Sequence, residues 1–377
     1  MRFSAFVNNW AALAVIATVS QVQAQQTSDR FGRWDANKDG KVTREEMPAW
    51  FKDSFDAIDT NKDGVITSDE EQKFRPTNPQ GPNAQIPNTV RSIPDLPYAA
   101  TDNPKQRLDL YLPKSPKSDK PLPLVVFVHG GAWRVGDKRT SYFQVAPFLQ
   151  SGDYAAACIS YRLVPEAIWP AQIYDCKAAI RWLRANAKDY NIDPDKIGVM
   201  GTSSGGHLVA LLGTSGDVPE LEGKLGDNLN VSSRVTCVVD QFGHSDFLAL
   251  GGGANDPTSP IGGLLGGGVQ DKKYAARESS PITFVSKDDP PFLILHGTND
   301  PAIPFKQSEI LLENLKKAGV DAMLVPVTGG GHGDFGTQEV PNRAKQFFDK
   351  HLRGQDVTVS SEPIKAGPPT QKNNKKG

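Results

Sequence analysis

The sequence has little cysteine, no excess of charge of either sign and few apolar runs, and each shortage excludes a class of protein. Its 42 basic and 43 acidic residues nearly cancel, whereas a nucleic-acid-binding protein carries a basic excess. The three cysteines, Cys158, Cys176 and Cys237, cannot all pair, and their places in expected strands and a helix favour small buried residues over a disulfide framework. After residue 24, no apolar run is long enough to span a bilayer.

The first 24 residues have the pattern of a secretory signal peptide. Arg2 gives a positive start, Trp10 to Val19 form an apolar run, and Val22-Gln23-Ala24 is a small-x-small cleavage site. The run is too short to span a membrane, although an uncleaved N-terminal anchor is the alternative. We therefore expect residues 1–24 to lie outside the fold, and the protein to be secreted or periplasmic without stable membrane insertion.

Residues 25–75 contain two acidic loops that match the EF-hand calcium loop at each ligand position. Each loop has a glycine at the sixth position, where the backbone turns sharply. Hard oxygen ligands of this kind favour Ca²⁺ over zinc or magnesium. The expected ligands are Asp35, Asn37, Asp39, the Lys41 carbonyl and Glu46 in the first loop, and Asp59, Asn61, Asp63, the Val65 carbonyl and Glu70 in the second.

Only Met47 to Ile58 separate the two loops, which leaves room for one helix. This spacing argues against the usual face-to-face pairing of EF-hand loops, although Val42 and Ile66 would be able to pair as a short strand. Extracellular modules of this type bind Ca²⁺ at about 10⁻⁴ to 10⁻³ M. We therefore expect constitutively filled, structural sites, or a segment through which a protein partner docks, in place of a switch.

The remaining chain divides into a linker, a large domain and a tail. Residues 76–93 are rich in Pro, Asn and Gln and predict an extended linker, and residues 354–377 predict a disordered tail. Between them, residues 94–353 alternate between strands and helices, which predicts an α/β fold with a doubly wound, mostly parallel sheet. We expect strands at 108–112, 124–128, 154–160, 197–200, 235–241, 291–295 and 322–327, and helices at 171–187, 206–212, 305–318 and 341–352.

Ser203 lies at the centre of Gly201-Thr-Ser-Ser-Gly205, between a predicted strand and a predicted helix. In that setting Gly-x-Ser-x-Gly is typical of a nucleophilic serine on a tight turn. The glycines remove the Cβ atoms that would clash where strand and helix approach, and the helix N-terminus offers N–H groups to an oxyanion. A purely structural turn is the alternative interpretation.

A nucleophilic serine needs a base, and the base needs a carboxylate to orient it. On this architecture the acid and then the histidine follow the serine along the chain. His332 lies in a glycine-rich loop after the last strand and is the expected base. Asp300 follows the preceding strand and is the expected acid, with a simple turn cap as its alternative role. We rank Asp246 and Asp334 as lesser acid candidates and expect His296 to be a structural histidine at a strand end.

The oxyanion hole is expected in the loop His129-Gly-Gly-Ala-Trp133, which follows a buried strand. Glycines let backbone N–H groups point about 3 Å from a developing oxyanion. We expect the donors to be Gly131, Ala132 and, from the helix after the nucleophile, Ser204. His129 is expected to brace the loop.

Five segments together resemble the α/β-hydrolase superfamily: HGGAW at 129–133, YRL at 161–163, GTSSGGH at 201–207, HGTNDP at 296–301 and GGGHG at 329–333. More narrowly, they resemble carboxylesterases near the hormone-sensitive-lipase and bacterial feruloyl-esterase-like branches. The resemblance covers residues 94–353. It implies that Ser203, Asp300 and His332 form a catalytic triad that needs no cofactor.

The glycine-rich segment Phe247 to Ser280 is expected to form a mobile flap over the site. Such a cover suits short acyl or aryl esters, of acetyl or feruloyl type, on a bulky alcohol such as a polysaccharide. Peptide and lactone hydrolysis use the same triad and remain alternatives. A non-catalytic, calcium-dependent binding protein on a hydrolase fold is a further alternative, although the chain retains all three triad residues.

Overall fold

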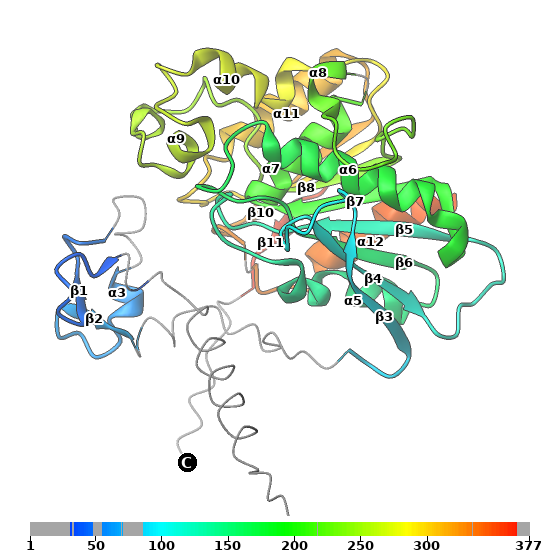
Figure 1. Ribbon diagram of the computed structural model, residues 1–377, viewed down its shortest axis with the longest axis horizontal. Helices are drawn as coiled ribbons and strands as arrows, with labels where there is room; N and C mark the ends of the chain where they lie inside the picture. The colour runs from blue at the N-terminus through cyan, green and yellow to red at the C-terminus, as the bar shows by residue number, and fades with distance from the viewer. Residues whose placement is uncertain are drawn as a thin grey trace, which may run out of the picture. The chain divides into compact units, whose positions relative to one another are not determined.

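The computed structural model of the protein describes residues 31, 34–47, 55–68, 70, 86–216, 218–333 and 335–367. The chain divides into two compact units, Met1–Pro79 and Gln80–Gly377, which are drawn in Figure 1. The predicted signal peptide and residues 76–85 of the predicted linker lie outside the described residues. None of the described helices combines the length and apolar character needed to cross a bilayer.

A mostly parallel sheet forms the centre of the larger unit. Its strands lie in the order β11-β10-β9-β8-β7-β5-β6-β4-β3, and only β4 and β3 run antiparallel to their neighbours. The described strands of this sheet are β3 (Val90–Pro97), β4 (Arg107–Pro113), β5 (Leu122–Val128), β6 (Ala155–Ile159), β7 (Ile192–Thr202), β8 (Cys237–Gln241), β9 (Phe292–Gly297), β10 (Ala322–Thr328) and β11 (Ile364–Lys365).

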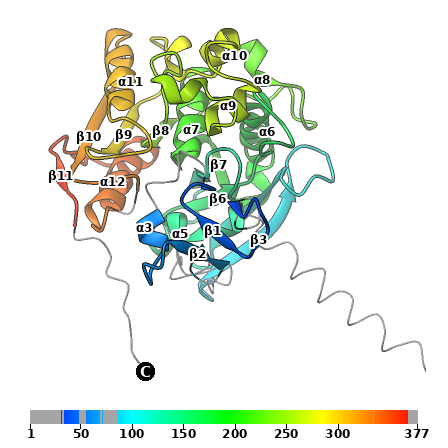
Figure 2. The same cartoon turned by 90° about the vertical axis from the view of Figure 1, so that its left-hand side faces the viewer.

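Helices cover both faces of this sheet (Figures 1 and 2), and each face has its own apolar core. Alternate residues of β5 face the two cores: Leu124 and Val126 contribute to one, Val125 and Phe127 to the other. Every residue of β5 is buried, as expected for a central strand of a parallel sheet with two covered faces. One face carries α6 (Ala171–Ala185), α7 (Ser204–Thr214) and α11 (Lys306–Lys317), and the other carries α5 (Tyr142–Gln150) and α12 (Glu339–Arg353).

This arrangement confirms the predicted α/β fold with a doubly wound sheet. Each predicted strand and helix of residues 94–353 is present, with ends shifted by a few residues. The sequence did not reveal β3, α5 or β11. Helix α5 was missed because Pro147 lies inside it, and proline is a strong breaker of helical patterns.

The prediction of a mobile flap at Phe247 to Ser280 is wrong. The segment is a compact cap that contains η4 (Gly252–Asn255), α9 (Pro260–Leu265) and α10 (Lys273–Glu278), drawn in yellow-green above the sheet in Figure 1. Phe247 and Leu264 are fully buried in the main core. The glycines serve close packing, because a Cβ on Gly262 or Gly268 would collide with a backbone carbonyl oxygen.

The predicted boundaries at both ends of the domain also need correction. The linker was expected to reach residue 93, but Val90 begins β3. The tail was expected to be disordered from residue 354. Instead, Ile364 in β11 pairs with Val327 in β10, and the Gly367 N–H donates a hydrogen bond to the Phe335 carbonyl. Both segments were misjudged because their polar composition hides the few apolar residues that anchor them. Residues 368–377 lie outside the described part of the chain.

In the smaller unit, the two acidic loops pair through β1 (Lys41–Thr43) and β2 (Val65–Thr67), which are antiparallel. Val42 lies opposite Ile66, and both side chains are fully buried. The expected pairing of these two residues is confirmed, whereas the expectation against face-to-face loops is wrong. The short connection, which includes α3 (Phe55–Ile58), permits the pairing because three residues from each loop are enough to join them.

Candidate active site

Ser203 lies on a strained turn between β7 and α7. Its backbone has φ 55° and ψ −120°, a conformation that non-glycine residues rarely adopt and that marks functional sites. The flanking glycines make the turn possible: a Cβ on Gly201 would collide with the Gly205 carbonyl, and one on Gly205 would collide with the Val128 carbonyl. The Ser203 N–H donates to the Gln241 carbonyl at 3.0 Å, which fixes the turn to the end of β8.

His332, Asp300 and Ser203 are joined in one hydrogen-bonded chain. The Ser203 hydroxyl lies 3.0 Å from His332 Nε2, and His332 Nδ1 lies 2.8 Å from Asp300 Oδ2. Because the carboxylate is an acceptor, Nδ1 carries the hydrogen, and Nε2 is left free to take the serine proton. The structure therefore brings together the three residues that the sequence predicted, from the ends of β7, β9 and β10.

Asp300 is held as a carboxylate by hydrogen bonds that saturate both of its oxygens. Burial alone would raise its pKa, but bonds from His296 and His332 and from the Ile303 N–H outweigh burial and hold the pKa of Asp300 well below its usual range. Oδ1 accepts from the N–H groups of Ala302 and Ile303 at 2.8 and 2.9 Å. The side chain of Asp300 is fully buried, whereas that of His332 remains 28% exposed.

His296 is a second, fully buried histidine on Asp300. Its Nε2 lies 3.1 Å from Asp300 Oδ2 and 3.0 Å from the Ile303 carbonyl. Both partners are acceptors, so Nε2 carries a hydrogen. The Ser308 hydroxyl lies 2.7 Å from His296 Nδ1. His296 is therefore a structural histidine, as predicted, but it acts directly on the acid, which the sequence did not show.

Of the two lesser acid candidates, the structure describes only Asp246, and it makes no hydrogen bond to His332. Asp246 Oδ1 caps its own turn by accepting the Leu248 N–H at 2.9 Å. Asp334 lies outside the described residues.

The loop after β5 presents backbone N–H groups beside Ser203. Gly131 and Ala132 both have positive φ, at 121° and 54°, which turns the chain so that the Gly131 carbonyl accepts from the Arg134 and Val135 N–H groups. Ser204 is the first residue of α7, where an N–H has no partner within the helix. Among the described residues, no acceptor pairs with the N–H groups of Gly131, Ala132 or Ser204. They are available to an oxyanion, as predicted from the sequence.

His129 braces this loop. Its Nδ1 lies 2.8 Å from the Gly130 carbonyl, and its ring stacks on Tyr161 with centroids 4.4 Å apart. Burial lowers the pKa of His129 to about 4, so the ring is neutral at neutral pH. The Tyr161 hydroxyl donates to the His129 carbonyl at 3.0 Å and lies 3.3 Å from Ser204 Oγ, which joins the oxyanion loop to the start of α7.

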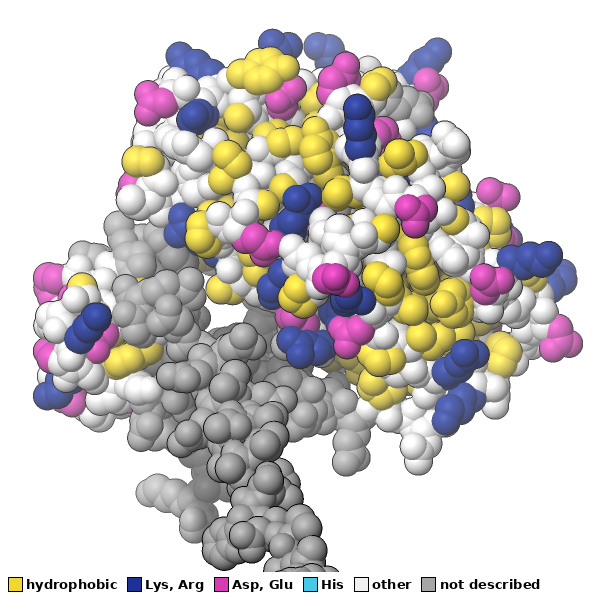
Figure 3. Space-filling model, viewed as in Figure 1, with side chains coloured by type: hydrophobic (Ala, Val, Ile, Leu, Met, Phe, Trp, Pro, Cys, Tyr) yellow, Lys and Arg dark blue, Asp and Glu magenta, His cyan; other side chains and the backbone are white. Residues whose placement is uncertain are grey.

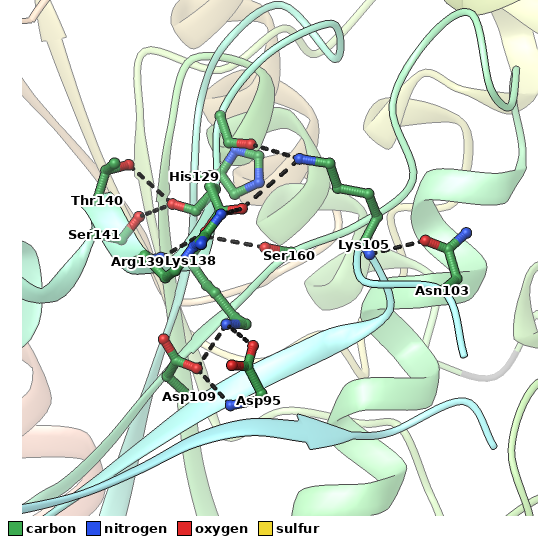
Figure 4. A network of polar contacts seen from close by, with 12 residues as sticks. Asp95, Asn103, Lys105, Asp109, His129, Lys138, Arg139, Thr140, Ser141 and Ser160 are labelled. Atoms are coloured by element: carbon green, nitrogen blue, oxygen red, sulfur yellow. Dashed lines mark hydrogen bonds and ion pairs between the residues drawn. The ribbon is translucent and has the colours of Figure 1, made fainter. Parts of the chain in front are cut away.

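A buried ion pair supports the far end of the same loop (Figure 4). Lys138 Nζ lies 2.7 Å from one carboxylate oxygen of Asp109 on β4 and 2.7 Å from one of Asp95 on β3. Lys138 and Asp109 are 2% and 3% exposed, so the pair is desolvated and costly to break on one side. The Lys138 N–H also donates to Ser160 Oγ at 3.0 Å. Sequence patterns did not indicate this network, because its members come from four separate segments.

The acidic loops of the smaller unit place oxygen atoms at the predicted positions. In the second loop, Asp59 Oδ2 accepts the Gly64 N–H at 2.9 Å, and Asp63 Oδ1 accepts the Val65 N–H at 3.0 Å. Gly64 has φ 85°. Although burial would raise it, hydrogen bonds from the Thr67 N–H and hydroxyl lower the pKa of Glu70 to about 2. The first loop repeats this pattern with Asp35, Asn37, Asp39, Gly40, Lys41 and Glu46.

The donor set of both loops suits a hard cation. Each loop offers Asp, Asn and Glu oxygens and a backbone carbonyl, and no nitrogen or sulfur ligand. No group of three or more His, Cys, Asp or Glu side chains is gathered for a metal ion among the described residues. The ligands Asn61 and Val65 bring the amide and carbonyl oxygens that complete such a loop.

Comparisons with known proteins agree with the geometry. The BD-FAE family model matches residues 108–315, and an EF-hand model matches residues 28–47 and 51–74. Among solved structures, a truncated carbohydrate esterase from gut microbiota is 35% identical, with a TM-score of 0.67 over 71% of this chain and 99% of that one. A bifunctional GH43-CE protein from Bacteroides eggerthii is 33% identical, with a TM-score of 0.64 over 71% of this chain and 36% of that one.

Among curated proteins, the esterase LipC of Mycobacterium tuberculosis is 31% identical over 62% of this chain and 58% of its own length. The chain spans about half the length of the curated relatives it matches. Structure and similarity therefore agree on an α/β-hydrolase fold, whose sheet runs from β3 to β11, and on an EF-hand segment before it.

Proposed function

The chain belongs to the BD-FAE family of α/β-hydrolases, and we propose that it is a secreted serine carboxylesterase. The observation that carries this proposal is the hydrogen-bonded chain from Ser203 through His332 to Asp300, beside free N–H groups. The proposed substrates are short-chain or aryl esters, including those that decorate polysaccharides. No cofactor takes part in the proposed reaction.

The geometry supports a two-step reaction. Ser203 Oγ attacks the ester carbonyl while His332 Nε2 takes its proton, and Asp300 stabilises the imidazolium that forms. The N–H groups of the oxyanion loop and of Ser204 bind the negative oxygen of the tetrahedral intermediate, and losing one such donor costs about 3 kcal/mol of transition-state stabilisation. His332 returns the proton to the leaving alcohol. A water molecule, activated by the same nitrogen, then hydrolyses the acyl-enzyme.

One observation supports a short or flat acyl group, and a second supports the nature of the alcohol. Behind the oxyanion loop, Trp133 is 1% exposed and packs edge-on against Phe247 of the cap, with ring centroids 5.8 Å apart. The compact cap fills this side with aromatic rings, so long alkyl chains gain little room there. The similarity to a carbohydrate esterase and to a GH43-CE protein supports an ester-decorated saccharide as the alcohol part.

The proposal includes Ca²⁺ in the two EF-hand loops and a location outside the cytoplasm. The oxygen-only donors and the positive φ of Gly40 and Gly64 support Ca²⁺ binding. A filled pair would stabilise residues 25–75, whose apolar core includes Trp34 and Phe55, and would offer a fixed surface to a partner. The signal-peptide pattern of residues 1–24 supports secretion.

The test is hydrolysis of a chain-length series of p-nitrophenyl esters and of methyl ferulate by the full chain and by Ser203→Ala. We expect activity that is highest for acetyl to butyryl or for feruloyl esters and that disappears in the variant. A peptide amide cleaved while all esters remain intact would replace esterase by peptidase. Activity that persists in Ser203→Ala would refute the nucleophile.

A further inference from the structure

A cluster of aromatic rings beside the oxyanion loop contains buried nitrogen atoms without a hydrogen-bond partner in the described chain. Its members, which we call the Trp133 cluster, are Trp133, Trp169, His207, His244 and Phe247. The unpaired atoms are Nε1 of both tryptophans and Nδ1 of both histidines. Buried polar atoms in native proteins are nearly always paired, so such a concentration calls for an explanation.

His244 differs from the rest of the cluster. Nε2 of His207 lies 2.6 Å from the Ser279 carbonyl, which accounts for that ring as a tie between α7 and the cap. His244, by contrast, has a buried Nδ1 that makes no hydrogen bond to any described residue, and the residue as a whole is only 8% exposed. Its ring is packed between Trp133, with centroids 5.4 Å apart, and Phe247, with centroids 5.3 Å apart.

The position of His244 brings it to the reacting groups. The loop after β8 is tied to the nucleophile turn, because the Ser203 N–H bonds to the Gln241 carbonyl. The next residue, Phe242, packs edge-on against the His332 ring with centroids 4.9 Å apart. His244 follows two residues later, and its ring packs against Trp133, the residue after Ala132. It lies close enough to His332 and Asp300 for their charges to affect its pKa.

Burial, together with the neighbouring histidines His207 and His332, lowers the pKa of His244 well below its usual value. The ring is therefore neutral when the site works, with one nitrogen as donor and the other as acceptor. A hydroxyl group both donates and accepts, so it pairs with either tautomer.

We propose that His244 binds a hydroxyl group of the substrate and thereby selects esters of polyols and sugars over esters of simple alcohols. This inference rests on the proposed esterase function and adds a specificity-determining residue to it. The aromatic neighbours Trp133 and Phe247 leave the imidazole without a polar partner of its own, so an alcohol that lacks the hydroxyl leaves a buried polar group unpaired. Sites of that kind discriminate strongly against the deoxy analogue.

The test compares two acetate esters that differ in the hydroxyls of the alcohol, 1-O-acetylglycerol and propyl acetate. kcat and KM are measured for the full chain, for His244→Phe, which keeps a ring and removes both nitrogens, and for His351→Phe. The control residue His351 lies on α12 against Phe347, away from the site. The quantity compared is kcat/KM for acetylglycerol divided by kcat/KM for propyl acetate.

We expect this ratio to fall about 5- to 50-fold in His244→Phe, mainly through KM for acetylglycerol, and to stay constant in His351→Phe. His244→Asn, which restores a donor and an acceptor, is expected to recover part of the ratio and covers the case in which the Phe variant does not fold. An unchanged ratio in a folded His244 variant, or an equal loss for both esters, overturns the inference while leaving the esterase function intact. Failure of the wild-type chain to hydrolyse acetylglycerol overturns the inference, and only failure on the p-nitrophenyl series and methyl ferulate as well overturns the esterase function.

Discussion

Replacing His296 tests whether the catalytic acid depends on a second histidine. The informative variant is His296→Phe, which preserves a ring in the buried site and removes both nitrogens. In the wild-type protein, His296 Nε2 donates to Asp300 Oδ2 at 3.1 Å, and the same oxygen accepts from His332 Nδ1 at 2.8 Å. The substitution therefore removes one of the two histidines that hold the reacting oxygen of the acid.

The cost follows from the hydrogen bonds that are lost. A hydrogen bond to a charged group contributes about 1.5–3 kcal/mol, and a buried group left without its partner costs about 1–3 kcal/mol. The variant loses the bond to Asp300 and leaves the Ser308 hydroxyl, 2.7 Å from His296 Nδ1, without that partner. We therefore expect the free energy of unfolding to fall by about 3–5 kcal/mol, which corresponds to about 6–20 °C in Tm for a domain of this size.

The pH dependence gives a readout that general destabilisation would not produce. The pKa of Asp300 is held below its usual value in the folded protein, so its ionisation stabilises the fold above the usual carboxyl pKa, and this contribution is lost as the pH falls through the folded-state value. Without His296 the folded-state pKa rises toward the ordinary value, so the variant has less of this contribution to lose below about pH 4. The difference in unfolding free energy between wild type and variant should therefore be largest above about pH 4 and shrink as the pH falls below it.

The assay is thermal unfolding and kcat/KM between about pH 3 and pH 8 for the wild type, His296→Phe and His296→Gln. The Gln variant keeps a donor near the position of Nε2 and should recover part of the lost stability. A stability difference between wild type and His296→Phe that stays constant with pH would show that His296 only fills space. A Phe variant as stable as the wild type would refute the hydrogen-bond reasoning altogether.

Other residues give separate tests. Asp300→Asn should lower kcat by about 10⁴-fold, because the amide favours the wrong tautomer of His332. Stopped assays with the purified, folded variant measure kcat, and a decrease of less than about tenfold would exclude Asp300 as the acid. Truncation after Gly354 removes β11 and the hydrogen bond from the Gly367 N–H to the Phe335 carbonyl. It should therefore lower Tm and speed hydrogen exchange at the β10 edge of the sheet, whereas truncation after Gly367 should change neither quantity. Ca²⁺ should raise the melting temperature of the EF-hand unit in the full chain by mass action, and the increase should be smaller in Glu70→Gln. It should have little effect on kcat, and a large loss of kcat on chelation would contradict a purely structural role.

Most of the candidate site follows from the sequence because each part of it has a local pattern. Ser203 needs glycines on both sides, and the triad residues follow strands, so chain order and strand ends were enough to select His332 and Asp300. The role of His296 was not visible, because its contact with Asp300 depends on how the chain bends after β9. The sequence gives no signal for a role of His244, since its neighbours Trp133 and Phe247 come from distant segments.

The errors in the fold have one physical cause. The glycines of the cap were taken as a source of mobility, whereas a Cβ on Gly268 would collide with the Asn255 carbonyl; glycine permits close packing as readily as it permits motion, and only the partner decides which. The tail likewise carries Ile364 among polar residues, and a two-residue strand leaves no periodic pattern. Short contacts of this kind are set by tertiary neighbours, which local sequence does not contain.

The Lys138 network shows why such long-range contacts matter for chemistry. Lys138 follows the oxyanion loop by a few residues, and its buried charge is met by Asp109 and Asp95 from the two antiparallel strands at the edge of the sheet (Figure 4). The face seen in Figure 3 mixes basic and acidic side chains without a field of one sign. A buried ion pair that is broken on one side costs about 3–5 kcal/mol, which is enough to hold the loop in one place. Strands β3 and β4 therefore brace the chain that follows the loop after β5 through one lysine, although neither strand contributes a residue to the triad.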